Sequence, residues 1–246
     1  MPEISESKYL VTASWDDVPH LDAKTKAELL AATPPHLRGA RAKGEPSLGS
    51  GAIYPIELSE VLVDPFAVPA YWPRAYGFDV GWNRTAAVWG AVDRETDCWY
   101  LYTEHYRGQA EPSIHVTAIR ARGDWIPGCI DPASRGRQQK DGAQLLADYR
   151  DLGLNLIEAV NAREAGLYAV WERLSTGRLK VFRTLINWQA EYRLYRRDEA
   201  GKVIKEFDHL MDATRYLIVS GKDVATTVPV DRDIPTAAAA DPSTGY

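Results

Sequence analysis

The sequence predicts an α/β fold in which one mixed central sheet, an antiparallel β-meander followed by parallel strands, is flanked by helices. The first observation behind this is a series of three strand-like runs separated only by short polar turns, which is typical of a meander. The second is that apolar runs alternate with segments of helical spacing from residue 112 onward. That alternation is the pattern of parallel strands joined by crossover helices.

The elements follow from these two patterns. The meander strands are predicted at 75–80, 85–92 and 98–106, joined by polar turns at 81–83 and 93–97. Seven further elements are predicted in chain order: a helix at about 112–122, a strand at 126–131, a helix at about 141–152, a strand at 154–160, a helix at 163–174, a hairpin at 189–205 and a helix at about 207–219. The long helical segments carry apolar residues at a spacing of three or four, so each presents one face to the sheet.

The N-terminal part is organised differently. We expect a strand at 8–15, a helix at about 22–32 with Asp22 as its N-cap, and a linker over the Pro, Gly and Ser-rich stretch 33–52. A second proline-punctuated stretch precedes the first core strand. The sequence therefore divides into an arm at 1–60, a main domain at 61–222, and a tail at 223–246 that we expect to be disordered.

Composition limits the class of protein. The chain has 246 residues, 45% hydrophobic and 26% charged, which fits a soluble globular protein with a sizeable core. No apolar run approaches the roughly 20 residues of a membrane span, and no secretion signal is visible, so a cytoplasmic location is expected. Cys98 and Cys129 are expected to stay reduced and buried. No zinc-binding pattern is present.

The net charge of -5 argues against binding nucleic acid through a general basic excess. Bound cations can offset acidic ligands, however, and residues 173–205 are basic with interleaved aromatics. A solvated surface is the equally good alternative for that segment. The candidate DNA contacts within it are Arg193, Arg196, Arg197, Lys202 and Lys205.

Two aspartates stand at the ends of predicted strands. Asp79 lies in the apolar run GFDVG, where a buried carboxylate is costly unless it is paired or bound to a metal. Its alternative role is to cap the turn at Gly81. Asp131 ends the strand IPGCID, at the edge where open α/β sheets place their sites, although an ordinary Asp-Pro turn would look the same.

The predicted last helix carries a third acidic signal. Asp208 and Asp212 are four residues apart and share a helix face, with His209 and Arg215 beside them. Asp208 could serve as an N-cap, whereas Asp212 lies inside the helix, where aspartate is unfavourable. Hydrolysis of a phosphodiester by two metals needs three or four carboxylates around two cations about 4 Å apart. The acidic residues together therefore suggest a metal site.

The segments GFDVGWNRTAAVWG, GCIDPAS and EFDHLMDATRYLI resemble the nuclease domain of tailed-phage terminase large subunits, over roughly residues 72–220. The resemblance implies a ribonuclease H-like fold and an endonuclease that cuts concatemeric double-stranded DNA in the host cytoplasm. It implies Mg²⁺ or Mn²⁺, two ions in all, held by Asp79, Asp131 and Asp212, with Asp208 or His209 as a fourth group. These five residues are the candidate catalytic set.

The same resemblance implies partners. The stretches SWDDVPHL and GARAKGEPSLGSGAIYP are similar to the end of the terminase ATPase region, but no phosphate-binding loop of the G-x-x-x-x-G-K-[ST] type is present. The chain should therefore cut DNA without pumping it. The implied partners are double-stranded DNA and the ATPase domain, portal and small subunit of a packaging motor, with no membrane.

Three other interpretations stay open. A Holliday-junction-resolvase-like nuclease is the nearest relative among nucleases. The run from Asp79 to Thr85 also resembles the first phosphate loop of actin-like sugar kinases, which would need a second domain with its own loop. A docking module of a packaging motor without catalysis would have purely structural aspartates and would bind no divalent ion.

Overall fold

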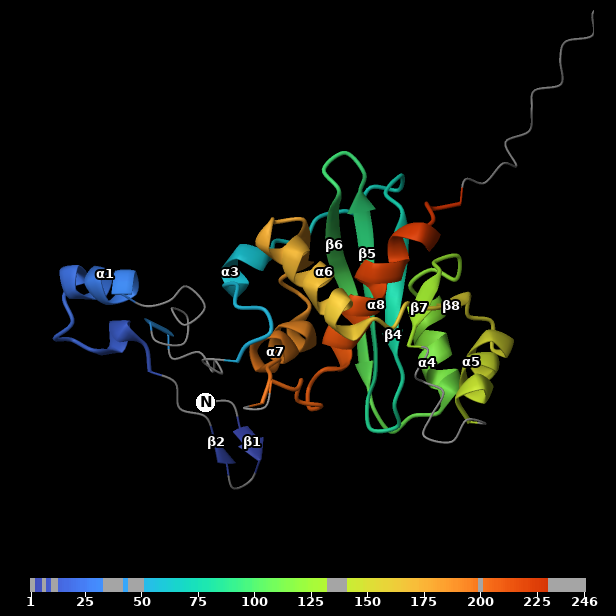
Figure 1. The fold of residues 1–246 in the computed structure, drawn as a ribbon, viewed down its shortest axis with the longest axis horizontal. Coiled ribbons are helices and arrows are strands. Elements are labelled where there is room, and N and C mark those ends of the chain that lie inside the picture. The colour runs from blue at the N-terminus through green and yellow to red at the C-terminus, as the bar shows by residue number, and fades with distance from the viewer. Residues whose placement is uncertain are drawn as a thin grey trace, which may run out of the picture.

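The computed structural model describes residues 3–5, 8–9, 13–32, 42–43, 51–131, 141–198 and 201–229. Its centre is a seven-stranded mixed sheet in the order β3-β9-β6-β5-β4-β7-β8, which confirms the predicted fold class (Figure 1). The strands of this sheet are β3 (Leu62–Val63), β4 (Arg74–Asp79), β5 (Thr85–Asp93), β6 (Cys98–Arg107), β7 (Gly128–Ile130), β8 (Leu156–Glu158) and β9 (Leu179–Phe182).

Helices cover this sheet. The described helices from the sheet region are α3 (Leu58–Val61), α4 (Pro112–Arg120), α5 (Asp141–Asp151), α6 (Arg163–Ser175), α7 (Ile186–Leu194) and α8 (His209–Val224). The N-terminal part holds β1 (Glu3–Ser5), β2 (Lys8–Tyr9), a short 3-10 helix at Trp15–Asp17, and α1 (Ala23–Ala32). Among the described residues, no helix has the length and apolarity needed to cross a membrane.

The meander and the parallel half meet at β4. On one side β4 pairs antiparallel with β5, which in turn pairs antiparallel with β6. On the other side β4 pairs parallel with β7, with Gly77 opposite Cys129 and Phe78 opposite Ile130. Parallel neighbours end at the same edge of a sheet, so the chain leaves β4 and β7 at adjacent positions. The topology thus brings Asp79 and Asp131 to one place.

Alternation along β4 gives the sheet two different faces. Tyr76 and Phe78 point into a core formed with α4 and α5, whereas Ala75 belongs to the core on the opposite face, beneath α6 and α8. Residues two apart share a face, so Gly77 and Asp79 point toward α8 as well. The site residues therefore lie under the last helix.

α8 crosses the sheet over β4 and β5, with α6 alongside it (Figure 1). The crossing is very close at Gly77, where an added Cβ would lie 1.8 Å from the backbone oxygen of Ala213. Only glycine lets two backbones approach this closely. Gly77 thus sets how closely α8 packs on β4, at the level of Ala213.

Two predictions about local structure were wrong. Residues 186–194 form helix α7, not the first arm of a hairpin, and only the isolated bridge between Arg197 and Val203 remains of the predicted pairing. The aromatic residues of this segment are buried on one face of the helix, and the backbone nitrogens of Asn187 and Trp188 donate to the Glu104 carboxylate, at 3.0 and 2.9 Å. The acceptor that caps the N-terminus of α7 comes from β6, so the local sequence does not indicate that a helix begins here. The parallel strand β9 was missed as well.

The second error concerns the predicted strand at 8–15. Lys8–Tyr9 pairs with Glu3–Ser5, but Trp15–Asp17 is a turn of 3-10 helix with a capping box from Ser14. The helix predicted at 22–32 is confirmed, since the Asp22 carboxylate accepts from the Thr25 nitrogen at 2.7 Å. Cys98 and Cys129 are buried and free, as expected. Most of the predicted linker, at 33–41 and 44–50, and the tail at 230–246 lie outside the described residues.

Candidate active site

Asp79 is the last residue of β4, and Asp131 follows directly after β7. The Asp131 backbone nitrogen donates to the Phe78 oxygen at 3.4 Å, so the ladder between the two strands extends up to the acidic residues. Both carboxylates leave the sheet at the same edge on neighbouring strands. The two aspartates that the sequence analysis placed at strand ends are thus brought together.

The Asp79 carboxylate lies against the first turn of α8. Its Oδ2 is 2.8 Å from Nδ1 of His209, and its side chain is only 16% exposed. Burial raises the pKa of Asp79 to about 6, and the negative charges of Asp212 and Asp131 add to this increase. The bond to Asp79 in turn raises the pKa of His209. Aspartates from two other segments therefore act on the buried Asp79 carboxylate.

Asp208 and Asp212 begin α8, Asp208 as its N-cap residue and Asp212 in its first turn. Both are buried, at 5% and 4% exposure. The Asp208 side chain makes no hydrogen bond to the backbone of the helix, so the capping role considered for it is absent. Its Oδ2 is buried without a hydrogen bond among the described residues, although Lys205 is 3.3 Å away.

Three cations surround the Asp212 carboxylate. Nη2 of Arg163 and Nζ of Lys205 each lie 3.3 Å from its Oδ2, and Nη2 of Arg215 lies 3.1 Å from its Oδ1. Arg163 is the first residue of α6 and Lys205 precedes α8, so these cations come from different segments. Arg163 was not singled out by the sequence analysis, because only the packing of α6 against α8 brings it here.

Glu191 on α7 is a second residue that the sequence analysis missed. It is 2% exposed, and burial raises its pKa. Its Oε2 accepts from the Leu210 nitrogen at 2.6 Å and its Oε1 accepts from the Tyr106 hydroxyl at 2.6 Å. Glu191 thereby satisfies a free backbone donor at the start of α8 and ties that turn to β6. The sequence analysis predicted a hairpin over 189–205 and did not single out Glu191.

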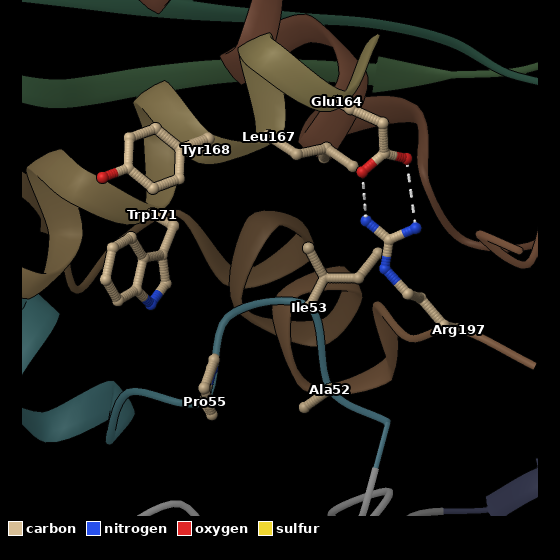
Figure 2. Close-up of a pocket in the computed structure, with 8 residues that line it drawn as sticks. All are labelled: Ala52, Ile53, Pro55, Glu164, Leu167, Tyr168, Trp171 and Arg197. Carbon is tan, nitrogen blue, oxygen red and sulfur yellow. Dashed lines mark hydrogen bonds and ion pairs between the residues drawn. The ribbon is translucent and has the colours of Figure 1, made fainter. Parts of the chain in front are cut away.

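The five candidate DNA contacts differ in their surroundings. Arg197 is paired with Glu164, at 2.6 Å between Nη2 and Oε2, beside a pocket of about 430 Å³ (Figure 2). Lys205 faces Asp208 and Asp212. Arg193 belongs to the last turn of α7, Arg196 bridges to Ala52, and Lys202 donates its backbone nitrogen to Asp198.

The donor chemistry at this edge suits a hard divalent cation, since carboxylate oxygens dominate. Among the described residues, however, no group of three or more His, Cys, Asp or Glu side chains stands close enough to hold a metal ion as arranged. The carboxylate of Asp212 is directed to Arg163, Lys205 and Arg215 instead. The structure thus brings Asp79, Asp131, His209 and Asp212 to one edge, with Asp212 neutralised by side-chain cations.

Comparison with known proteins places this arrangement in context. Residues 76–220 match the family described as the terminase RNaseH-like domain. The large terminase subunits of Enterobacteria phage LP7 and Salmonella phage P22 are each 30% identical over 222 residues, which cover 86% of this chain. The chain spans less than half the length of these relatives, 46% and 44%.

Solved structures give the same picture. The nuclease domain of the P22 large terminase is similar with a TM-score of 0.69 at 28% identity, covering 73% of this chain and 96% of that one. The large terminase of the thermophilic bacteriophage D6E, in complex with ADP, has a TM-score of 0.60 at 21% identity, covering 84% of this chain and 54% of that one. The terminase nuclease of the thermophilic phage G20c, with bound magnesium, has a TM-score of 0.51 at 14% identity, covering 70% and 98%.

Proposed function

We propose that this chain, which belongs to the terminase RNaseH-like domain family, is an endonuclease that uses divalent metal ions to cleave double-stranded DNA. The observation that carries the proposal is Asp79, a buried carboxylate whose pKa is raised to about 6 beside Asp131 and Asp212. A carboxylate that is buried near like charges gains strongly from a bound cation.

The residues proposed to hold metal are Asp79, Asp131 and Asp212, with Asp208 or His209 as the fourth group. The buried Oδ2 of Asp208, which lacks a hydrogen bond, is a donor that fits this role. Mg²⁺ or Mn²⁺, as two ions, would supply Lewis-acid activation of water and stabilisation of the leaving oxygen. The magnesium bound in the G20c nuclease supports the choice of ion, within a shared fold.

The protein's own groups have defined tasks in this proposal. His209 holds Asp79 in place through the bond at 2.8 Å, and Glu191 holds the turn that carries His209. Arg163 and Lys205 neutralise Asp212 while no divalent cation is bound, and release of that carboxylate frees both side chains. Freed cations beside the site can bind DNA phosphates. Arg193, Arg196, Arg197 and Lys202 are proposed as more distant phosphate contacts.

The biological setting is proposed from the relatives. In it the chain is the nuclease part of a terminase large subunit that cuts concatemeric phage genomes in the host cytoplasm during packaging. Its partners are double-stranded DNA and the ATPase domain, portal and small subunit of the motor. The proposed division of the chain is an arm at 1–60 that adjoins the ATPase region, a nuclease domain at 61–222 and a tail at 223–246.

A plasmid-nicking assay tests the proposal. The parent protein should nick supercoiled DNA with Mg²⁺ or Mn²⁺ and not with EDTA, and Asp79→Asn and Asp131→Asn should each abolish nicking. Asp124→Asn is the matched control, since Asp124 is an exposed aspartate outside the site, and it should cut normally. Binding of DNA without nicking in either metal would make the chain a docking module. Cleavage confined to four-way junctions would make it a resolvase.

A further inference from the structure

A pocket of about 280 Å³ opens beside the candidate active site. It is lined by Asn83, Arg84, Tyr106, Glu206, Phe207 and His209. His209 belongs to both places, because its Nδ1 bonds Asp79 while the residue also lines the pocket. The volume is just below the range of about 300–1,000 Å³ in which small-molecule sites fall, so the pocket suits one nucleotide-sized group.

The turn between β4 and β5 forms one wall, and it is held by its backbone. The Thr85 hydroxyl donates to the Gly81 oxygen at 3.0 Å, and the Gln109 nitrogen donates to the Trp82 oxygen at 2.8 Å. A Cβ on Gly108 would lie 2.0 Å from the Asn83 oxygen, so the two segments touch along their backbones. Backbone contacts therefore hold this wall of the pocket in position.

Tyr106 and Arg84 lie against each other in the pocket. The Arg84 guanidinium lies over the Tyr106 ring, 4.4 Å from its centroid, and the Tyr106 hydroxyl is bonded to Glu191. Within the described part of the chain, Arg84 forms no ion pair with a carboxylate. A stacked guanidinium without an ion-pair partner can contact a phosphate and present a flat face to a base.

Phe207 also lines this pocket and is unusual in two ways. Its φ is 56°, in the left-handed region that non-glycine residues rarely adopt, and it is 55% exposed although it is a large apolar side chain. Backbone strain of this kind collects at functional sites. The residue stands between Glu206 and Asp208, directly before the helix that carries the candidate ligands.

We propose that this pocket binds one unstacked nucleotide of the DNA strand next to the phosphodiester at Asp79. The base lies against the Phe207 ring, and Arg84 contacts a phosphate of the same strand. The inference rests on the proposed nuclease function and extends it. A pocket of this kind would make the site selective for DNA in which one base is locally unstacked from its neighbours. An unstacked base has lost its neighbours and regains stacking on an aromatic side chain.

Fluorescence anisotropy in calcium buffer tests the inference, with a fully paired duplex and the same duplex carrying one unpaired nucleotide. Gel analysis verifies that both stay intact. The parent should bind the second DNA about fivefold or more tightly. Phe207→Gly, which accepts the positive φ, should bind both equally, and Phe207→Asn should match it, because asparagine also tolerates this backbone. Arg84→Gln should lower the salt dependence of binding by about one phosphate contact.

Tyr168→Ala is the control, since Tyr168 is a 64% exposed aromatic that lines the pocket of about 430 Å³, next to Trp171 (Figure 2). It should keep the parent's preference. Equal binding of both duplexes by the parent, an unchanged preference in Phe207→Gly, or an equal loss in Tyr168→Ala overturns the inference. These outcomes are separate from the nicking assay. If the parent nicks DNA but binds both duplexes equally, the nucleotide pocket is refuted and the nuclease function stands. If the parent prefers the duplex with an unpaired nucleotide but never nicks DNA, the nuclease function is refuted and the nucleotide pocket stands.

Discussion

Nδ1 of His209 lies 2.8 Å from Oδ2 of Asp79, so the first turn of the last helix is bonded to the end of the first core strand. The two residues are 130 positions apart in the sequence. The bond fixes the carboxylate on its buried side, and Glu191 fixes the same helical turn from α7. The candidate site is therefore held together by contacts between segments that are far apart in the sequence.

Asp79→Asn should stabilise the protein in metal-free buffer above pH 6. The pKa of Asp79 is about 6 in the folded protein and about 4 when unfolded. Between these values the folded state binds more protons, so the parent loses stability as the pH rises through this window. The variant lacks this loss, and its gain should reach about 3 kcal/mol at pH 8 and vanish below pH 4. Urea unfolding at several pH values measures it, and a large loss at pH 8 would support a structural role.

Asp212→Asn should eliminate cleavage with either Mg²⁺ or Mn²⁺, whereas Asp208→Asn should keep measurable activity. Asp212 lies within the packed first turn of α8, but Asp208 is at the helix start. The defect of Asp208→Asn should be greater in Mg²⁺, which demands stricter octahedral geometry. Nicking assays with both metals decide this. An inactive Asp208 variant beside an active Asp212 variant would reverse the assignment.

Lys205→Met should strengthen the binding of a divalent cation. Its Nζ lies 3.3 Å from carboxylate oxygens of both Asp208 and Asp212, where it competes with a metal for the same charges. A partly exposed ion pair is worth up to about 1 kcal/mol, so affinity for Mn²⁺ should rise about two- to fivefold by calorimetry. The metal-free melting temperature should fall. Lys202→Met, in the same segment, should change neither quantity, and weaker Mn²⁺ binding by Lys205→Met would contradict the competition.

Gly77→Ala should destabilise the fold much more than Gly90→Ala. The new Cβ at position 77 would meet the Ala213 backbone oxygen at 1.8 Å, and only displacement of α8 can relieve that contact. At Gly90 the closest atoms are side-chain carbons of Leu217 and Trp99, both at 2.8 Å, which can shift. We expect a loss of about 3 kcal/mol or more at position 77 and about 1–2 kcal/mol at position 90. The urea midpoints of the two variants measure this difference. Equal losses of stability would mean that the close packing of α8 on β4 does not depend on Gly77.

A buried histidine pair should make the protein sensitive to mild acid. Nε2 of His105 lies 2.9 Å from Nδ1 of His115, and burial lowers the pKa of both, that of His105 to about 4. Between about 6.5 and 4 the unfolded chain binds more protons, so stability falls as the pH drops through this window. The double substitution His105→Gln with His115→Asn should reduce the fall by about 2 kcal/mol. Substitution of the exposed His20 should not change the fall in stability. Urea unfolding at several pH values measures it, and the same dependence of stability on pH in the double variant as in the parent would contradict the prediction.

Much of the fold could be predicted because its elements carry local signals. The meander strands are apolar runs bounded by turn residues, and their pairing as β4-β5-β6 follows from the short connections. α7 could not be recognised in the same way. Its start is stabilised by Glu104 of β6, more than 80 residues earlier in the chain, and its buried aromatics also fit a strand.

The candidate site was predictable only in part, for a related reason. Asp79 and Asp212 stood out because an aspartate in an apolar strand or inside a helix needs a special partner. The partners themselves come from tertiary packing. Arg163 reaches Asp212 only because α6 lies beside α8, and Glu191 reaches Leu210 only because α7 does. The pairing of Arg197 with Glu164 likewise could not be read from charge composition.

The position of α8 also fixes when the site can exist during protein synthesis. A growing chain that has emerged as far as β8 already carries Asp79 and Asp131 on paired strands, but the third carboxylate and the histidine that holds Asp79 are still untranslated. Domain folding generally follows the order of synthesis. A ribosome-bound fragment therefore carries Asp79 and Asp131 without Asp208, His209 and Asp212, so the complete acidic set can assemble only after α8 has been synthesised.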